Sequence, residues 1–400
     1  MKGFHTEVKF CASCGELQPE LLHDFGQVPL AGYFPISGEE DFRNRLPMTL
    51  LRCTTCSLIQ ISPIVQDSYL FSDYRYRSFF SMKNHFKQLA SWLRSKGFSE
   101  ETRILEIGSN DGTLLSELAS LGFNPTGVDP ATNIARHAVA LGHKVIDGHF
   151  SEELVMNNDL YQKFDLVISC NSFAHITNIR DVAKATSQSL VDGGFFLVEV
   201  QAWDELVKRN AFDFVYHEHK YYYSVNSMEN LLSQFGFKME LSDHVESHGG
   251  SFRFLFRKDS IESRKEIIQR ETDKDTELNF EISIRHFYKQ IHSLESKLHE
   301  IHRSGGKVVG FGASGRANML LGYMNVQGLL DAVYDESPER IGRNMGFTKI
   351  RVEPFSSLKS DDYSHCVVLA WNFFDSIFEK WPHSGKILLR PLPVLEEFQN

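Results

Sequence analysis

Short apolar runs alternate with helical patterns of apolar residues through the middle of the chain. The runs predict strands over 103–107, 124–129, 144–146, 164–169 and 195–200, and the patterns between them predict helices over 83–96, 112–121, 131–141 and 179–190. The segments 237–244 and 250–257 predict a closing β-hairpin. Because strands and helices alternate, we expect an α/β domain with a mostly parallel sheet.

Two further regions follow this domain in the sequence. Residues 258–303 are charged and carry apolar positions such as Ile282, Phe287 and Leu294, which predicts a solvated pair of helices. Residues 304–400 begin with a strand, a glycine loop and a helix, which predicts a second α/β unit. The patterns therefore predict three domains, over 1–75, 76–257 and 258–400.

Composition narrows the functional classes. The chain has 400 residues, of which 42% are hydrophobic, and a formal net charge of −10. A net negative charge argues against binding to a nucleic acid backbone. The sequence contains no apolar stretch of about 18 residues, so we expect no membrane span. The first residues lack the apolar core of a signal peptide. We therefore expect a cytoplasmic protein that binds neither nucleic acid nor membrane.

Four of the six cysteines form two C-x-x-C pairs, Cys11 with Cys14 and Cys53 with Cys56. In a reducing compartment this pattern favours a metal over disulfides. Each pair can offer two thiolates from a tight turn, and two pairs complete a tetrahedral site with no open position. The sequence therefore predicts a structural zinc ion; redox-active or idle cysteine pairs are the alternative.

A glycine-rich turn follows the strand predicted over 103–107 and reads Glu106-Ile107-Gly108-Ser109-Asn110-Asp111-Gly112. A strand, a glycine turn and a helix form many nucleotide-binding loops. This turn lacks the Gly-Lys-Ser/Thr of a P-loop, and Asn110 replaces the second glycine of a dinucleotide fingerprint. An acid before the first glycine favours a ligand with a positive end, such as S-adenosylmethionine. An ordinary βα turn is the alternative.

The next strand also ends in an acid, Asp129, which is followed by Pro130. An acid at this place can accept hydrogen bonds from both hydroxyls of a ribose. The loop over 147–150 could reach an adenine. The predicted cofactor-binding residues are Glu106, Gly108, Asn110, Asp111, Gly112, Asp129, Pro130, Gly148, His149, Phe150 and Asn171.

Acid, base and phenol side chains concentrate in Tyr216-His217-Glu218-His219. Histidine titrates near neutral pH, and Glu or Tyr can orient it or donate to an oxyanion, so general acid–base chemistry is predicted. A metal pair at His217 and His219 and a structural hydrogen-bond cluster are the alternatives. A second glycine loop, Gly310-Phe311-Gly312-Ala313-Ser314-Gly315-Arg316, loosely matches a dinucleotide fingerprint and could bind a nucleotide diphosphate.

Five motifs occur in a fixed order along the chain. They are the paired cysteines, residues 106–112, residues 216–219, His248-Gly249-Gly250-Ser251-Phe252-Arg253 and residues 310–316. In this order, over essentially its whole length, the chain resembles the S-adenosylmethionine-dependent sugar C-methyltransferases, which make branched deoxysugars on nucleotide diphosphate carriers.

The resemblance implies an α/β fold with a central Rossmann-like methyltransferase sheet, a small N-terminal zinc-binding domain and a C-terminal Rossmann-like domain. It implies a nucleotide-diphosphate-linked ketosugar as substrate. By the same resemblance His219 is the base that generates an enolate, Tyr216 and His175 lie near the enolate, Glu218 orients, and Tyr76 contacts the sugar. The predicted substrate-binding residues are Tyr74, Tyr76, Tyr222, His248, Gly249, Gly312, Ser314, Arg316 and Asn372.

Three other functions remain open from the sequence. An O- or N-methyltransferase on a similar carrier-linked substrate would need no enolate base. A protein that binds a nucleotide sugar without catalysis would keep the fold alone. A nicotinamide oxidoreductase would use the glycine loop over 310–315. We expect a monomer or a homodimer.

Overall fold

The computed structural model describes residues 5–36, 45–70, 77–259 and 272–399. Contacts between residues group the chain into two compact units. The first comprises Met1–Leu22, Leu50–Trp203 and Lys220–Arg270, and the second comprises His23–Thr49, Asp204–His219 and Glu271–Asn400. These units are not consecutive segments, so the three domain boundaries expected from the sequence stay a prediction.

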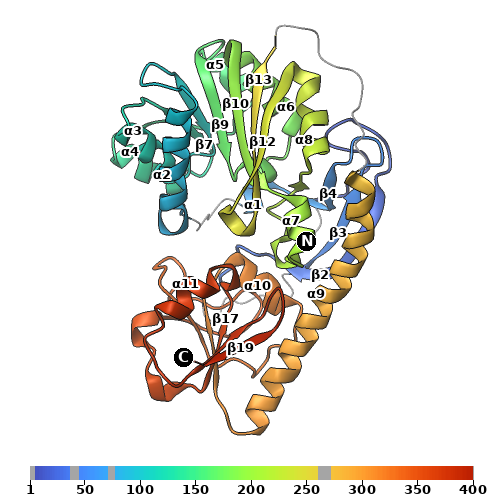
Figure 1. The fold of residues 1–400 in the computed structure, drawn as a ribbon, viewed down its shortest axis with the longest axis vertical. Helices are drawn as coiled ribbons and strands as arrows, with labels where there is room; N and C mark the ends of the chain where they lie inside the picture. The colour runs from blue at the N-terminus through green and yellow to red at the C-terminus, as the bar shows by residue number, and fades with distance from the viewer. Residues whose placement is uncertain (1–4, 37–44, 71–76, 260–271, 400) are drawn as a thin grey trace. The chain divides into compact units, whose positions relative to one another are not determined.

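The first unit is built on a seven-stranded sheet (Figure 1). Its strand order is β12-β13-β10-β9-β6-β7-β8. The strands are β6 (Ile104–Ile107), β7 (Thr126–Asp129), β8 (Lys144–Asp147), β9 (Phe164–Cys170), β10 (Leu190–Gln201), β12 (Phe237–Val245) and β13 (Ser251–Lys258). Strands β6 to β10 are parallel, whereas β13 is antiparallel to both β10 and β12. The predicted alternation of strands and helices and the closing hairpin are therefore confirmed.

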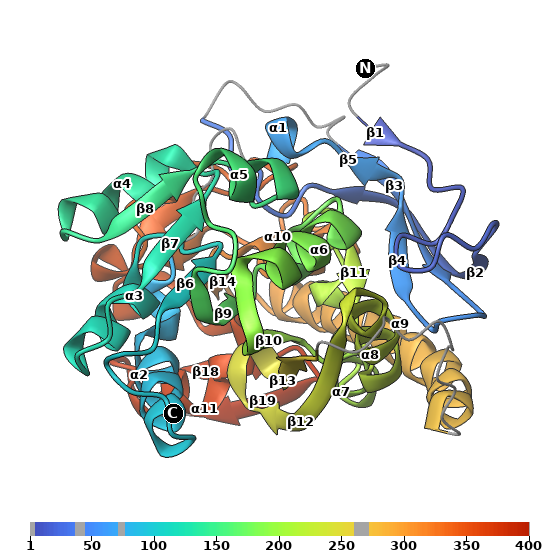
Figure 2. The ribbon, with the colours of Figure 1, turned by 90° about the horizontal axis from the view of Figure 1, so that it is seen from above.

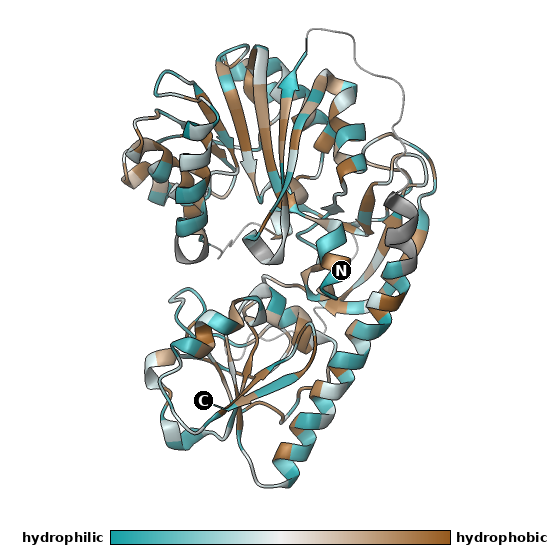
Figure 3. Cartoon of the chain, in the orientation of Figure 1, coloured by the Kyte–Doolittle hydropathy of each residue, from teal (hydrophilic) through white to brown (hydrophobic). Residues whose placement is uncertain are grey.

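Helices cover both faces of this sheet, and Figure 2 shows α3 and α4 on one side and α6 and α8 on the other. The helices are α2 (Phe79–Ser95), α3 (Thr113–Ser120), α4 (Thr132–Ala140), α5 (Glu152–Asn157), α6 (Ile179–Ser189), α7 (Trp203–Lys208) and α8 (Val225–Leu232). Successive strand residues point to opposite faces. Leu166 and Ile168 of β9 pack with residues of α2 and α3, whereas Val167 packs with residues of α6 and α8. Because both faces are covered, the strands are mostly apolar (Figure 3).

The N-terminal part of the chain adds small sheets and the cysteine pairs. Strand β1 (His5–Thr6) pairs with β5 (Ile64–Val65). A four-stranded sheet has the order β11-β4-β3-β2, with β2 (Glu20–Pro29), β3 (Arg45–Arg52), β4 (Ile59–Ser62) and β11 (Tyr221–Tyr222). The one-turn helix α1 (Asp67–Leu70) follows β5.

The second unit contains a six-stranded sheet of order β16-β15-β14-β17-β18-β19. Its elements are β14 (Val308–Phe311), α10 (Gly315–Gly322), β15 (Val333–Asp335), β16 (Val352–Pro354), β17 (His365–Val368), α11 (Phe374–Glu379), β18 (Ile387–Arg390) and β19 (Glu396–Gln399). All pairs are parallel except β18 with β19. The order matches the Rossmann pattern, which reverses between the first and fourth strands. The predicted second α/β unit is confirmed.

The charged region before this sheet is one helix in its described part, so the predicted pair of helices is wrong there. Helix α9 spans Thr272–Arg303, and residues 260–271 lie outside the described residues. Buried residues recur along it at the three- and four-residue spacing of one helical face, namely Phe280, Ile284, Phe287, Ile291, Leu294, Leu298 and Ile301. Ile282 lies off this face and is 56% exposed. Among the described residues, no helix has the length and apolar character needed to cross a membrane.

A buried charge cluster holds the centre of the first sheet. Glu199 of β10 is fully buried and accepts hydrogen bonds from His85 of α2 and Arg253 of β13. The Arg253 guanidinium also lies 4.8 Å from the ring of Trp92. Burial by itself would raise the pKa of Glu199, but the hydrogen bond from His85 and the charges of His85 and Arg253 hold this pKa below its usual value. Glu199 thus joins α2 to strands from two parts of the sequence.

We expect Glu199→Gln to lower the free energy of unfolding at pH 7 by about 3–5 kcal/mol, because it removes one partner of a buried charge cluster. The pKa of Glu199 is lower in the folded state than in the unfolded state, where it is about 4.3. Its stabilising contribution is therefore complete above the unfolded-state pKa and is lost as the pH falls through the folded-state pKa. The difference between wild type and variant should therefore shrink in urea titrations below about pH 4. Asp165→Asn, at the exposed ion pair with Arg103, is the control and should cost at most about 1 kcal/mol. A pH-independent difference would contradict the assignment.

Candidate active site

A pocket of about 270 Å³ opens in the first unit at the carboxyl ends of β6, β7 and β9. Strands β6 and β9 are neighbours in the sheet but not in sequence, and ligands of open α/β sheets bind at such a reversal of strand order. The pocket brings together these predicted cofactor-binding residues: Gly108, Asn110, Asp129, Pro130, Gly148, His149, Phe150 and Asn171. His175, predicted as catalytic, also lines it. Glu106, Asp111 and Gly112 are not among its lining residues.

The turn after β6 explains why a glycine stands at position 108. Gly108 has a φ of +76°, in the left-handed region, and a Cβ there would lie 2.4 Å from the Cβ of Ser172. Asn110, with a φ of +50°, is also left-handed, a conformation that Asn tolerates better than most residues. The backbone therefore curls tightly over the strand ends. A side chain at position 108 would prevent the turn from lying this close to Ser172.

Glu106 lies beneath this turn as a buried carboxyl group that no positive group offsets. It is 2% exposed, and its Oε2 atom has no hydrogen-bond partner among the described residues. Desolvation, together with repulsion from Asp129 and Asp111, raises the pKa of Glu106 well above its usual value. Buried polar atoms normally have a partner, so an orphaned carboxylate oxygen beside a pocket fits a ligand that brings a cation.

Asp129 and Asp111 are both engaged within the protein. The two carboxylate oxygens of Asp129 accept hydrogen bonds from the backbone N–H groups of Asn110 and Ala131, each at 2.8 Å. Burial raises the pKa of Asp129, while these two bonds oppose the rise. Each oxygen keeps a second lone pair for a ligand hydroxyl. Asp111 accepts a 2.6 Å hydrogen bond from Thr113 Oγ1. Gly112, at the N-cap of α3, has a φ of 80°.

The four predicted metal ligands form one cluster in the first unit. The Sγ atoms of Cys11, Cys14, Cys53 and Cys56 all lie within 4.8 Å of one another, with 3.5 Å between Cys11 and Cys56 and 3.6 Å between Cys14 and Cys53. Thiolates 2.3 Å from a tetrahedral zinc ion would be about 3.8 Å apart. The cluster is therefore of the right size and chemistry to hold a metal ion.

The Tyr-His-Glu-His segment belongs to the second unit, and two of its side chains form a pair. The hydroxyl group of Tyr216 lies 2.9 Å from Nε2 of His219, and the two rings stack with centroids 4.0 Å apart. Nδ1 of His219 lies 3.1 Å from the carbonyl oxygen of Phe214. A carbonyl oxygen can only accept, so this contact assigns the proton of neutral His219 to Nδ1. Nε2 therefore carries the basic lone pair and accepts from Tyr216.

Glu218 and His217 anchor the same segment. Oε1 of Glu218 accepts a 2.8 Å hydrogen bond from the backbone N–H of Gly32, where a Cβ would stand 2.9 Å from that oxygen. His217 is fully buried, and its Nε2 lies 3.3 Å from the carbonyl oxygen of Pro47. The two histidines of the motif thus turn to different carbonyl oxygens, and Oε1 of Glu218 binds the backbone.

Arg316 and Asn372, predicted to contact substrate, are brought together inside the second unit. Nη1 of Arg316 donates to Oδ1 of Asn372 at 2.7 Å, and Nη2 lies 2.8 Å from Oδ2 of the fully buried Asp213. The Arg316 guanidinium lies 3.4 Å from the centroid of the Phe214 ring. Nε1 of Trp371 also donates to Asp213, at 2.9 Å. Arg316 therefore fixes the residues that lead into Tyr216.

Local contacts explain two residues of the glycine loop in the second unit. Gly312 has a φ of +93°, and a Cβ there would lie 2.7 Å from the Cβ of Ala370. Ser314 caps α10 by accepting a hydrogen bond from the N–H of Ala317. Nothing in these contacts excludes the predicted binding of a nucleotide diphosphate, which stays a prediction.

The remaining predicted residues are dispersed. Tyr222 is 1% exposed on β11, next to the ring of Trp203. Gly249, with a φ of 83°, ends the 3-10 turn Ser247–Gly249. Tyr74 and Tyr76 lie outside the described residues, as does the side chain of His248.

Sequence reasoning missed several residues of both regions. Met82 and Phe86 of α2 line the pocket, and their four-residue spacing on one helical face was a usable signal. Asp67 and Thr177 also line it, without any local motif. Asp213, an acid between two phenylalanines, signalled a buried charge that needs a partner.

Residues 76–242 match the family model of a methyltransferase domain, and residues 246–393 match the C-methyltransferase C-terminal domain. C-methyltransferase NovU from Streptomyces niveus is 32% identical over 251 residues, which cover 60% of this chain and 59% of NovU. The chain thus matches less than two thirds of that relative's length.

Two solved structures are similar to the chain at low identity. Magnesium protoporphyrin IX methyltransferase from Synechocystis PCC 6803 is 14% identical with a TM-score of 0.35, over 44% of this chain and 79% of that one. An S-adenosylmethionine-dependent methyltransferase from Mesorhizobium loti is 14% identical with a TM-score of 0.35, over 43% of this chain and 99% of that one. At these TM-scores neither carries a further argument.

The two family models follow one another along most of the chain, in the order that the sequence motifs predicted. The sugar substrate stays a prediction, because neither model description names one. The chain is thus similar to a methyltransferase domain over 76–242 and to a C-methyltransferase C-terminal domain over 246–393.

Proposed function

We propose that this chain transfers the methyl group of S-adenosylmethionine to the carbon next to the ketone of a nucleotide-diphosphate-linked deoxysugar. The observation that carries the proposal is the Tyr216–His219 pair, in which Nδ1 is turned to a carbonyl oxygen and Nε2 is left basic. An O- or N-methyltransferase would not need a base that removes a proton from carbon to generate an enolate. The match of residues 246–393 to a C-methyltransferase C-terminal domain supports the same conclusion.

The pocket of the first unit is the proposed cofactor site. Asp129 would accept from the ribose hydroxyls, and the loop over 148–150 would face the adenine. Glu106, which precedes the lining residues Ile107 and Gly108, would lie towards the positive end of S-adenosylmethionine. The orphaned Oε2 of Glu106 and the close approach at Gly108 support this fit. When bound, S-adenosylmethionine supplies an electrophilic methyl group.

The residues of the second unit supply the proton chemistry. Nε2 of His219 takes the proton from the carbon beside the ketone, and the electron pair of that C–H bond moves onto the ketone oxygen as an enolate. The Tyr216 hydroxyl, which donates to Nε2 in the free protein, turns to donate to the enolate oxygen. The enolate carbon would then bond to the methyl group, while the methyl–sulfur bond breaks and its electron pair leaves on the sulfur of S-adenosylhomocysteine. Phe214 and Glu218 hold this pair in place through backbone contacts.

The first prediction concerns Glu106. A cationic ligand beside this carboxyl group would lower its raised pKa, so binding of S-adenosylmethionine should release protons at a pH between the two pKa values and weaken as the pH falls. Calorimetry in buffers of different ionisation enthalpy measures this release. Glu106→Gln should abolish it and weaken binding about 10- to 150-fold, the loss of one charge-assisted hydrogen bond. Asp165→Asn, at the opposite end of β9, is the matched control and should change neither property.

The second prediction concerns the metal. We propose that the four cysteines hold one structural zinc ion, which the closed four-thiolate set would keep from acting in catalysis. Elemental analysis of protein purified without a metal-binding tag should find about one zinc per chain, and Cys53→Ser with Cys56→Ser should lose it. Cys366→Ser, at a buried cysteine outside the cluster, should retain it. Full zinc in the double variant would contradict the assignment.

The third prediction concerns the base. His219→Asn keeps an N–H group able to donate to the Phe214 carbonyl but removes the basic Nε2. It should slow both methyl transfer and exchange of the substrate proton with deuterated water by about 10²–10⁴-fold, while binding of S-adenosylmethionine stays the same. Mass spectrometry with nucleotide-linked ketosugars measures both rates. Tyr216→Phe keeps the stacked ring and should have a smaller effect.

Proton exchange at the wild-type rate in His219→Asn would make another group the base, with His175 the next candidate. Methylation of oxygen or nitrogen by the wild-type protein would replace the proposed reaction with the O- or N-transfer alternative. Binding of a nicotinamide cofactor in place of S-adenosylmethionine would exclude both.

A further inference from the structure

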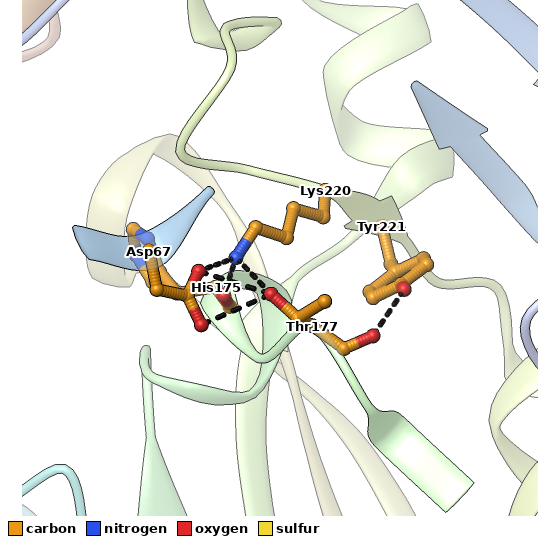
Figure 4. Close-up of polar contacts among 5 residues, drawn as sticks. All are labelled: Asp67, His175, Thr177, Lys220 and Tyr221. Atoms are coloured by element: carbon orange, nitrogen blue, oxygen red, sulfur yellow. Dashed lines mark hydrogen bonds and ion pairs between the residues drawn. The ribbon is translucent and has the colours of Figure 1, made fainter. Parts of the chain in front are cut away.

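A fully buried lysine lies beside the cofactor pocket of the first unit. Lys220 is 0% exposed, and its ammonium group donates to Asp67 Oδ1, to the carbonyl oxygen of His175 at 2.7 Å and to Thr177 Oγ1 at 2.7 Å (Figure 4). An ammonium group has three N–H donors, and all three are used. The charge is balanced by Asp67, so the group is both neutralised and fully hydrogen-bonded.

The acceptors of Lys220 are linked to one another. Thr177 Oγ1 lies 3.0 Å from each carboxylate oxygen of Asp67 and donates to that group. The hydroxyl of Tyr221 donates to the carbonyl oxygen of Thr177 at 2.8 Å. The backbone N–H of Lys220 donates to the carbonyl oxygen of Ala174 at 2.8 Å. The loop over 174–177 is therefore held by Lys220 and Tyr221 through both backbone and side-chain atoms.

This loop forms part of the pocket wall. Asp67, His175 and Thr177 all line the pocket, whereas Lys220 lies behind them and does not. A buried ammonium group cannot shift without leaving charged hydrogen bonds unmade in a place that water does not reach. The two charged bonds to the loop, with Asp67 as counter-charge, thus fix the loop more firmly than neutral contacts would. Lys220 also directly follows His219 in the sequence.

We propose that Lys220 is a positioning residue, which acts through its bonds to the His175 carbonyl oxygen, Thr177 and Asp67 to hold His175 at the pocket wall in the place that methyl transfer requires. This rests on the proposed function, but the placement of the loop can be measured without turnover. A misplacement of about 1 Å near reacting groups can lower a rate by about 10²-fold. Loss of the three bonds should therefore affect the rate more than the affinity for S-adenosylmethionine.

The test uses the full chain and two variants. Lys220→Met removes the charge and all three bonds, which leaves Asp67 unbalanced. Lys220→Met with Asp67→Asn removes both charges, so stability should return towards the wild-type value while the bonds to His175 and Thr177 stay absent. The matched control is Lys258→Met, at a lysine of β13 that donates to the Leu190 carbonyl oxygen and pairs with Asp192, neither of which lines the pocket.

Two measurements are made on protein saturated with S-adenosylmethionine. Hydrogen–deuterium exchange of the peptide over 172–178 should speed up at least tenfold in both Lys220 variants and stay unchanged in Lys258→Met. With a nucleotide-linked ketosugar that wild type methylates, kcat should fall about 10- to 100-fold in both variants, while the Kd for S-adenosylmethionine changes less than about threefold.

Three results would overturn the proposal. They are unchanged exchange of the loop, an unchanged kcat in Lys220→Met, and a double variant that recovers kcat together with stability, since the last result would make Lys220 an ion-pair partner only. If wild type methylates no ketosugar, the proposed function fails by itself. Loop exchange and the ring resonances of His175, compared between wild type and Lys220→Met, then decide whether Lys220 places His175.

Discussion

A charged group taken out of water needs a counter-charge or a full set of hydrogen bonds, and this requirement organises both units. Glu199 meets it with Arg253 in the first unit, and Asp213 meets it with Arg316 in the second. Each pair ties together segments that are far apart in the sequence. Glu106 lies among like charges instead. The fold therefore disfavours ionisation of Glu106, and a ligand that brought a positive charge would favour it.

The sequence allowed much of the fold to be predicted, because the relevant patterns are local. Short apolar runs between helical patterns identified the strands of the first sheet, and the glycine turn after β6 identified the pocket edge. The interpretation failed where local patterns look alike. One long amphipathic helix and a pair of helices differ only in a break between them, so a pair was expected over 258–303, whereas Thr272–Arg303 form the single helix α9. Ile282 was counted among the apolar positions, but it is 56% exposed.

The candidate site was harder to predict, because its geometry depends on contacts between distant segments. The motif identified Tyr216 and His219, but only the Phe214 carbonyl shows which nitrogen of His219 carries the proton. Arg316 was predicted to bind substrate, which stays a prediction, and no pattern in the sequence indicated its ion pair with Asp213. Lys220 has no motif at all. Its ion pair with Asp67 joins two positions that no periodicity in the sequence relates.

The β12–β13 hairpin bears on how the chain can be cut into fragments. The two family models meet between residues 242 and 246, within or directly after β12. A methyltransferase-domain fragment that ended there would lack β13, which lies between β12 and β10 in the sheet. Strand β10 would then present a long unpaired edge of apolar residues, the kind of surface that drives strands of different molecules to pair. A soluble fragment needs to run at least through Lys258, although the sequence family boundary comes earlier.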